Sequence, residues 1–146
     1  MTTHIRKQLR GAVATALTGL TTTGSRVHQS HMRPLGVAAL PCLLVAIDGT
    51  EVETSVHGEQ QRALTVIVQG VAKATTTVED TLDQIAMEVE TAAYAAGTLS
   101  GLVPGGLELI KDHTEFDDTL DQPAGVIVVE FRAICFTRVG TPGAAI

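Results

Sequence analysis

Aromatic residues are scarce in this chain of 146 residues, which has no tryptophan, one tyrosine and three phenylalanines. Hydrophobic residues nevertheless make up 45% of the sequence, so Val, Ala, Leu and Ile must fill the interior. A domain of this length buries roughly 70% of the surface that its unfolded chain exposes. We therefore expect one domain over residues 1–146, with an aliphatic core.

Basic residues are also few. Ten Lys and Arg stand against sixteen Asp and Glu, which gives a net charge of −6. A protein that holds nucleic acid by its phosphates needs clustered Lys and Arg. This balance argues against the nucleic-acid-binding class, and any DNA nearby is expected to be tolerated without specific binding.

Only two cysteines occur, Cys42 and Cys135, both in apolar runs typical of strands. A free thiol in such a run usually behaves as a small buried hydrophobe, which suits a reducing cytosol. The first residues lack the apolar core of a secretory signal. The longest apolar run, residues 35–47, is far shorter than the 20 or so residues of a membrane span and contains Pro41, so no membrane association is expected.

Helical spacing of apolar residues predicts two amphipathic helices. The first covers residues 3–20, with Arg6, Lys7 and Arg10 on its polar side. The second starts at Thr77, carries acidic residues in its first turn and ends at Gly97. Its expected apolar stripe consists of Val78, Leu82, Ile85, Val89, Ala92 and Ala96.

The remaining patterns predict strands. Residues 26–29 form a short strand, and residues 40–47 are apolar on both faces, as in a strand covered on both sides, before a turn at Asp48 and Gly49. Residues 50–73 read as a long hairpin with its tip at residues 57–61, and residues 107–110 and 125–137 as further strands. Residues 112–122 read as an acidic connection and residues 138–146 as a loose tail. The fold class is α+β, a mainly antiparallel or mixed sheet with a long β-hairpin and both helices on one face.

Catalytic and metal-binding patterns are weak. Carboxylate oxygens suit hard cations, but the acidic run lacks a glycine-pinned loop, so a solvated, partner-facing loop is the favoured reading of His113, Glu115, Asp117, Asp118 and Asp121. The spacing of His28 and His31 would suit zinc on a helix, yet the segment looks extended. Cys135 lies between apolar residues, and the glycines at positions 101, 105 and 106 form no phosphate cradle. We expect no enzyme activity, no metal and no cofactor.

Two surfaces are candidates for protein contacts. The hairpin carries Glu51, Glu53, Glu59 and Arg62 and extends beyond what one small core can cover, and exposed strand edges of this kind invite pairing with another chain. The basic side of the first helix, with Arg6 and Arg10, is either an ordinary solvated face, the favoured reading, or a contact with an acidic neighbouring subunit.

The order of these elements resembles the tail terminator proteins of long-tailed bacteriophages, the family of the lambda minor tail protein U. The resemblance spans the first helix to the strand ending near residue 137 and is diffuse, without a catalytic signature. It is carried by Ile5, Arg6 and residues 17–20, by Arg26, Val27, Pro34, Leu35, Leu40 and Pro41, by residues 82–89 with Glu88, and by Thr114, Glu115, residues 121–123 and residues 126–136.

The resemblance implies a structural virion protein. Such proteins form a hexameric ring that caps the tube of major tail protein, ends its polymerisation and offers its other face to neck or head-completion proteins, at the head-proximal end of a tail assembled in the host cytoplasm. DNA would pass through the lumen, and a ring of acidic subunits would not trap it. The partner-binding residues expected on this basis are the hairpin group Glu51, Glu53, Glu59 and Arg62, the acidic group Asp117, Asp118 and Asp121, and Arg6 with Arg10.

Two alternatives stay open. A neck or tail-completion protein would share ring symmetry and lack catalysis but bind a different face of the head–tail joint. A small α+β enzyme or ligand-binding domain would use the region of His28 and His31 or the acidic run.

Overall fold

Two fifteen-residue strands, β3 (Glu59–Lys73) and β5 (Ala124–Arg138), pair antiparallel along their whole length in the computed structural model, which describes residues 3–30, 32–33, 40–118 and 123–146. The other strands join this pair in the order β1-β2-β3-β5-β4, and β6 adds to β5, giving a six-stranded sheet. These are β1 (Val27–His28), β2 (Cys42–Thr54), β4 (Glu108–Asp117) and β6 (Thr141–Ala145). Only β1 and β2 run parallel.

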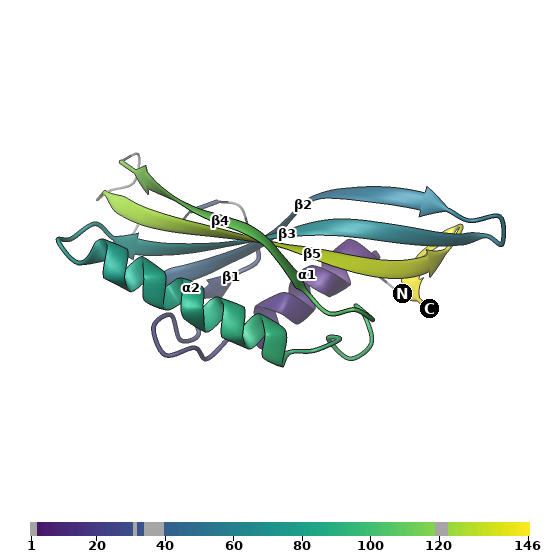
Figure 1. The fold of residues 1–146 in the computed structure, drawn as a ribbon, viewed down its shortest axis with the longest axis horizontal. Helices are drawn as coiled ribbons and strands as arrows, with labels where there is room; N and C mark the ends of the chain where they lie inside the picture. The colour runs from purple at the N-terminus through teal and green to yellow at the C-terminus, as the bar shows by residue number, and fades with distance from the viewer. Residues whose placement is uncertain (1–2, 31, 34–39, 119–122) are drawn as a thin grey trace.

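The two helices lie on one side of this sheet (Figure 1). Helix α2 (Val78–Ala95) agrees closely with the prediction, with Glu79 and Asp80 in its first turn and five residues buried against the sheet: Val78, Leu82, Ile85, Val89 and Ala93. Helix α1 (Ile5–Ala16) is shorter than expected, and the His4 imidazole caps it by accepting the Arg6 amide. The predicted α+β class with a mixed sheet and both helices on one face is confirmed.

Strand β2 continues where a turn was predicted. Asp48 and Gly49 lie inside β2, where the register with β3 shifts between Ile47 and Gly49 as in a β-bulge. The bulge takes up one extra residue without reversing the chain, so the hairpin is longer than predicted. Its true tip is at residues 55–58, where the Ser55 amide donates to the Glu59 carbonyl.

Two segments expected to be irregular are strands. Residues 112–117 of the predicted acidic connection belong to β4, Asp118 directly follows this strand, and residues 119–122 lie outside the described residues. The sequence pattern failed because β4 is an edge strand whose side chains are mostly solvent-exposed, so it has no apolar alternation. The C-terminal tail was expected to be loose, but Thr141–Ala145 turns back at Gly140 and pairs with β5.

The sheet is buried on both faces at one end only. On the helix side a large aliphatic core forms, with Phe131 as its one aromatic residue, and it includes Cys135. On the other side a smaller cluster gathers around Cys42 and consists of Cys42, Leu44, Val71, Ala124, Val126 and Val128. Residues 40–47 were predicted to be buried on both faces, and this is confirmed for residues 42–47, whereas Leu40 and Pro41 are half-buried.

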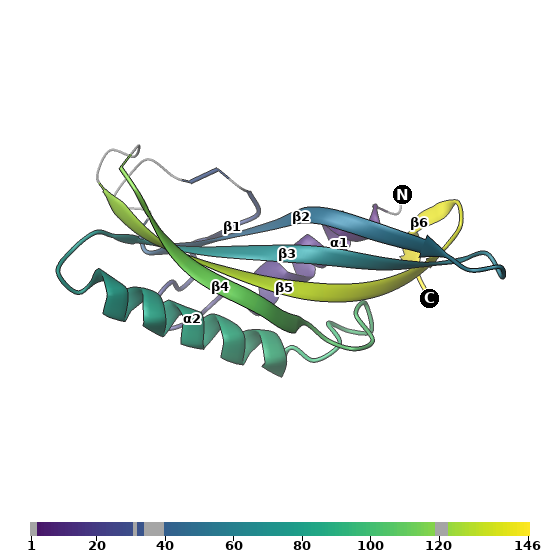
Figure 2. The ribbon, with the colours of Figure 1, turned by 45° about the horizontal axis from the view of Figure 1, so that its top comes forward.

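At the other end the sheet extends as a three-stranded arm, which we define as residues 51–62 of the β2–β3 hairpin with residues 136–138 of β5. Figure 1 and Figure 2 show this arm reaching past both helices, with the sheet strongly twisted between its two ends. Residues 51–57 are all exposed. In the described part of the chain, no helix is long and apolar enough to cross a bilayer.

Close contact between α2 and the sheet depends on Gly70. A Cβ added at Gly70 would lie 2.5 Å from Cγ2 of Ile85 and 2.9 Å from Cγ2 of Ile127. We expect Gly70→Ala to lower the free energy of unfolding by about 1–3 kcal/mol, because it overpacks the core, as measured by urea denaturation. Gly49→Ala is the matched control, since nothing lies within 4 Å of a Cβ there. Equal stability of the two variants would contradict this packing.

Candidate functional site

Glu51 and Glu53 lie on the open face of the sheet, opposite the helices. The register pairs Glu51 with Ala63 and Glu53 with Gln61, so all four side chains share that face. With Arg132 and Ile134 of β5 they line a hollow of about 240 Å³. Two carboxylates of the arm thus lie beside the Arg132 guanidinium, on the face of the sheet that neither α1 nor α2 covers (Figure 1).

Glu59 and Arg62 are separated by the sheet. Glu59 lies near the tip and lines a second hollow of about 280 Å³ with Glu53 and Phe136 on the open face. Arg62 is on the helix side, where it donates to Thr137 Oγ1 and to Gln60 Oε1, both at 3.0 Å. The four predicted hairpin residues therefore share one arm, but only the three glutamates gather around the hollows.

The basic residues of α1 lie beside β2. Arg6 donates to the Ile47 carbonyl at 3.2 Å, and Arg10 donates to Gln29 Oε1 at 3.2 Å. Lys7 is exposed. Burial first, and then the charges of Arg62 and Arg6, lower the pKa of His4 at the start of the helix. This end of α1 is consequently a positive surface.

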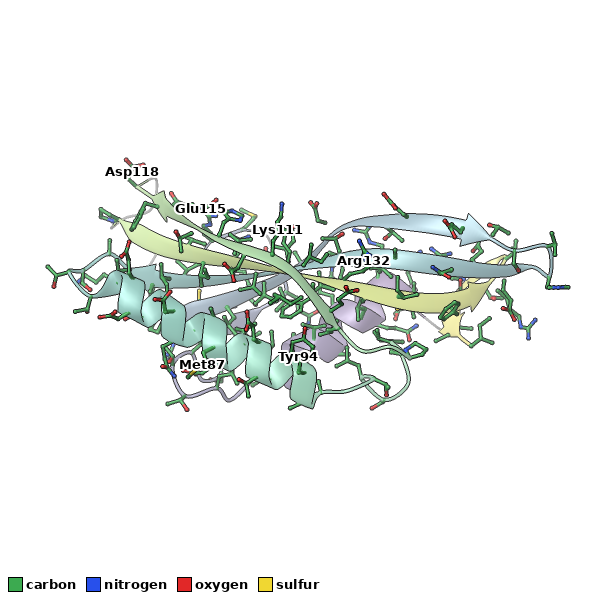
Figure 3. All side chains as sticks on the ribbon, in the orientation of Figure 1. Met87, Tyr94, Lys111, Glu115, Asp118 and Arg132 are labelled. Carbon is green, nitrogen blue, oxygen red and sulfur yellow. The ribbon has the colours of Figure 1, made fainter. Side chains whose placement is uncertain are left out.

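The predicted acidic group is at the opposite end of the sheet. Figure 3 shows Glu115 and Asp118 near the end of β4. Asp117 accepts a hydrogen bond from Arg33 at 2.6 Å, and its side chain is only 10% exposed. Asp118 is exposed, whereas Asp121 lies outside the described residues. The Asp117 carboxylate therefore binds Arg33 of its own chain, and within the described part of this group the exposed carboxylate is that of Asp118.

Arg33 is the centre of a polar cluster that the sequence patterns did not reveal. Its guanidinium donates to Glu115 and Asp117 of β4 and, at 2.9 Å, to Gln69 Oε1 of β3. These partners lie 36 to 84 residues away along the chain, so no local motif marks them. The cluster joins the segment after β1 to β4 on the open side of the sheet.

Charge pairing in this cluster shifts pKa values. The hydrogen bond from Arg33 lowers the pKa of Glu115, although burial acts in the opposite direction. Burial alone would lower the pKa of Arg33, but the bonds to Asp117 and Glu115 raise it overall. Both groups are therefore held in their charged forms.

A second unforeseen contact ties α2 to the loop before β1. Glu88 accepts hydrogen bonds from the Thr22 amide at 2.9 Å and the Thr22 hydroxyl at 2.6 Å, and Gln84 donates to it at 2.9 Å. Burial would raise the pKa of Glu88, but these bonds lower it overall. Glu88 thus acts as a positioning residue for the loop.

The weaker chemical candidates remain apart. His28 is exposed at the end of β1, and His31 lies outside the described residues. Burial raises the pKa of both Cys42 and Cys135 to about 11, so each is a neutral thiol inside a core, as predicted. Among the residues that the structure describes, no three His, Cys, Asp or Glu side chains are grouped so as to hold a metal ion.

The fold has counterparts among solved structures. A chain in the virion of a native gene transfer agent particle is similar to this protein at 16% sequence identity, with a TM-score of 0.44 over 90% of this chain and 92% of that chain. No family model matches the sequence, and no curated protein is found as a relative.

Arg33→Met tests the polar cluster. We expect it to lower the free energy of unfolding at pH 7 by about 1–2 kcal/mol, because the part-exposed cluster loses charged hydrogen bonds. The folded pKa of Glu115 is lowered, so its contribution is present above the unfolded pKa of about 4.3 and is lost as the pH falls below it. The difference in free energy of unfolding between the unmodified protein and Arg33→Met, measured by urea denaturation, should therefore be smaller at about pH 3 than at pH 7.

Lys111→Met is the matched control for this experiment. Lys111 pairs with Glu130 at 3.3 Å, but its side chain is 64% exposed, so little stability should be lost. If Arg33→Met and Lys111→Met cost the same, or if the cost of the former does not depend on pH, the proposed role of Arg33 is wrong.

Proposed function

We propose that this chain is a structural virion protein that acts as a phage tail terminator. In this proposal a ring of six copies caps the tail tube, ends its polymerisation and provides the surface for head joining. The resemblance in element order suggested this role. The observation that carries it is the exposed arm, which serves no purpose in the chain's own core.

The arm is a surface built for contact with another protein. Its strands are paired along their length, yet the side chains of residues 51–57 are exposed. The two hollows on its open face are lined by Glu51, Glu53, Glu59 and their neighbours. A single chain gains no hydrophobic burial from such an extension, because apolar contact area is what stabilises a fold. A partner that covers this face supplies the missing contacts, and in our proposal that partner is the tail tube.

Charge agrees with a passage for DNA. Each copy carries a net charge of −6, so a ring of copies repels phosphates and does not hold DNA in its lumen. No catalytic step is part of this function.

The test is to mix the purified protein with its own polymerising tail tube protein and to image the products by negative-stain electron microscopy. We expect tubes with a six-fold cap and a shortened length distribution. The arm variant, Glu51→Lys with Glu53→Lys, should cap about tenfold fewer tubes, since reversed charges at a contact cost at least the 1.4 kcal/mol that corresponds to a factor of ten.

The outcome that would contradict the proposal is uncapped tubes of unchanged length with the unmodified protein. A neck or tail-completion protein would then be the better assignment, because it binds elsewhere at the head–tail joint. Thr76→Lys is the control for the arm variant, since Thr76 is exposed in the turn between β3 and α2, at the opposite end of β3 from the arm, and its replacement should leave capping unchanged.

A further inference from the structure

The two helices carry opposite charges. Helix α1 contains three basic residues, Arg6, Lys7 and Arg10, and no acidic one. Helix α2 contains Glu79, Asp80, Asp83, Glu88 and Glu90 and no basic one. In a chain of mixed charge this separation creates two surfaces of opposite sign. Among the described residues, no ion pair joins the two helices.

The positive surface faces the β1–β2 edge of the molecule. Arg6 donates to the carbonyl of Ile47 on β2, and Arg10 donates to Gln29, which directly follows β1. Lys7 lies between them in the sequence and is exposed. We call Arg6, Lys7 and Arg10 the basic flank.

The negative surface faces the opposite edge, where β4 lies. Tyr94 marks this side of α2, because its hydroxyl accepts a hydrogen bond from the Leu109 amide on β4 at 3.2 Å. At about 100° per residue, Glu79, Asp83 and Glu90 lie about 20–60° from Tyr94 around the helix axis, on the side of buried Ala93, whereas Asp80 lies about 40° from Tyr94 in the outward direction. Glu88 is on the other side of α2, where it binds Thr22. We call Glu79, Asp83 and Glu90 the acidic flank.

Exposed aromatic side chains accompany the acidic flank. Tyr94 is 59% exposed near its C-terminal end, and Phe116 of β4 is 64% exposed. The Phe116 ring lies near Gly125, which Val78 at the start of α2 also contacts, so Phe116 marks the other end of the flank. Figure 3 shows Tyr94 and Met87 on the helix side of the molecule, away from Lys111 of β4. Aromatic residues beside charges are typical of the cores and rims of protein interfaces.

The strand order separates the two flanks. Because β1 and β2 end the sheet on one side and β4 on the other, the basic flank and the acidic flank of one copy face away from each other. A two-fold dimer would bring like flanks together or leave them unused. Opposite flanks meet only when copies associate head to tail, and such a contact closes into a ring when the rotation between copies allows it.

We propose that the basic flank of one copy binds the acidic flank of the next copy, and that this contact builds the ring. The inference rests on the proposed function in one respect, since that function requires a ring. Side chains, and not strand pairing, make the contact: the exposed β2 edge carries Asp48, Glu51 and Glu53, and charged edges resist backbone pairing with another sheet. A contact between exposed charges is weakened by salt.

Two charge-reversed variants test this contact. The basic-flank variant carries Lys7→Glu and Arg10→Glu, and the acidic-flank variant carries Asp83→Lys and Glu90→Lys. Each variant alone presents like charges on both flanks, so we expect its association to need about a hundredfold more protein. An equimolar mixture should recover the association of the unmodified protein, because the variants then alternate around the ring. Native mass spectrometry should find equal numbers of the two in each closed ring, in low-salt volatile buffer.

Controls keep the outcomes distinct. Circular dichroism and thermal unfolding verify that each variant is folded. The arm variant, Glu51→Lys with Glu53→Lys, changes the net charge by as much as the acidic-flank variant but should associate normally. The contact is overturned if either flank variant alone associates normally, or if the mixture fails to recover association. It is also overturned if the arm variant loses as much association as the flank variants, or if the unmodified protein stays monomeric at low salt. A ring that passes these tests but fails to cap tubes would reject the proposed function and leave the contact standing.

Discussion

The fifteen-residue pairing of β3 with β5 is the constraint on which the rest of the structure depends. It runs without a register shift from Glu59 opposite Arg138 to Lys73 opposite Ala124. At about 3.3 Å per residue the pair is about 50 Å long, whereas α2 covers about 27 Å. One helix therefore cannot cover it, and the sheet must leave an end uncovered or recruit other elements. The uncovered end is the arm.

Close approach of α2 decides where the covered end lies. Gly70 of β3 and Gly125 of β5 lack the Cβ atoms that would collide with Ile85 and with Val78. The helix can settle only over this glycine-bearing stretch, so the core forms there. On the open side of the same stretch a second cluster is buried, and Arg33 lies beside it, held to Gln69, Glu115 and Asp117. Charged groups are tolerated there because each is paired.

Local patterns in the sequence were sufficient to predict the helices and strands that are buried on one face or on both. The stripe of Val78, Leu82, Ile85 and Val89 predicted α2, and the apolar run predicted β5, because in both the core imposes a period on the sequence. Strand β4 has no such period, since it is an exposed edge, and the bulge at Asp48 looks like a turn in sequence.

The candidate site was only partly predictable. Glu51, Glu53 and Glu59 do gather on the arm, because they belong to one hairpin whose alternation is local. Arg33 joins residues on two strands that are distant in the sequence. The basic residues of α1 and the acidic residues of α2 face opposite edges of the sheet because of the strand order. Neither the partners of Arg33 nor that strand order can be read from local spacing.

The arm is exposed, but its contacts show how it is kept in shape. An isolated two-stranded hairpin is marginally stable in water, and a third strand is needed for order. Strand β5 supplies that strand, Arg62 donates to Thr137 across it, and the Val139 amide donates to the Gly58 carbonyl at the tip. An arm ordered before it meets a partner loses little conformational entropy on binding. In the proposed function, the three-stranded construction would therefore let a surface that contributes little to folding contribute to assembly without first having to become ordered.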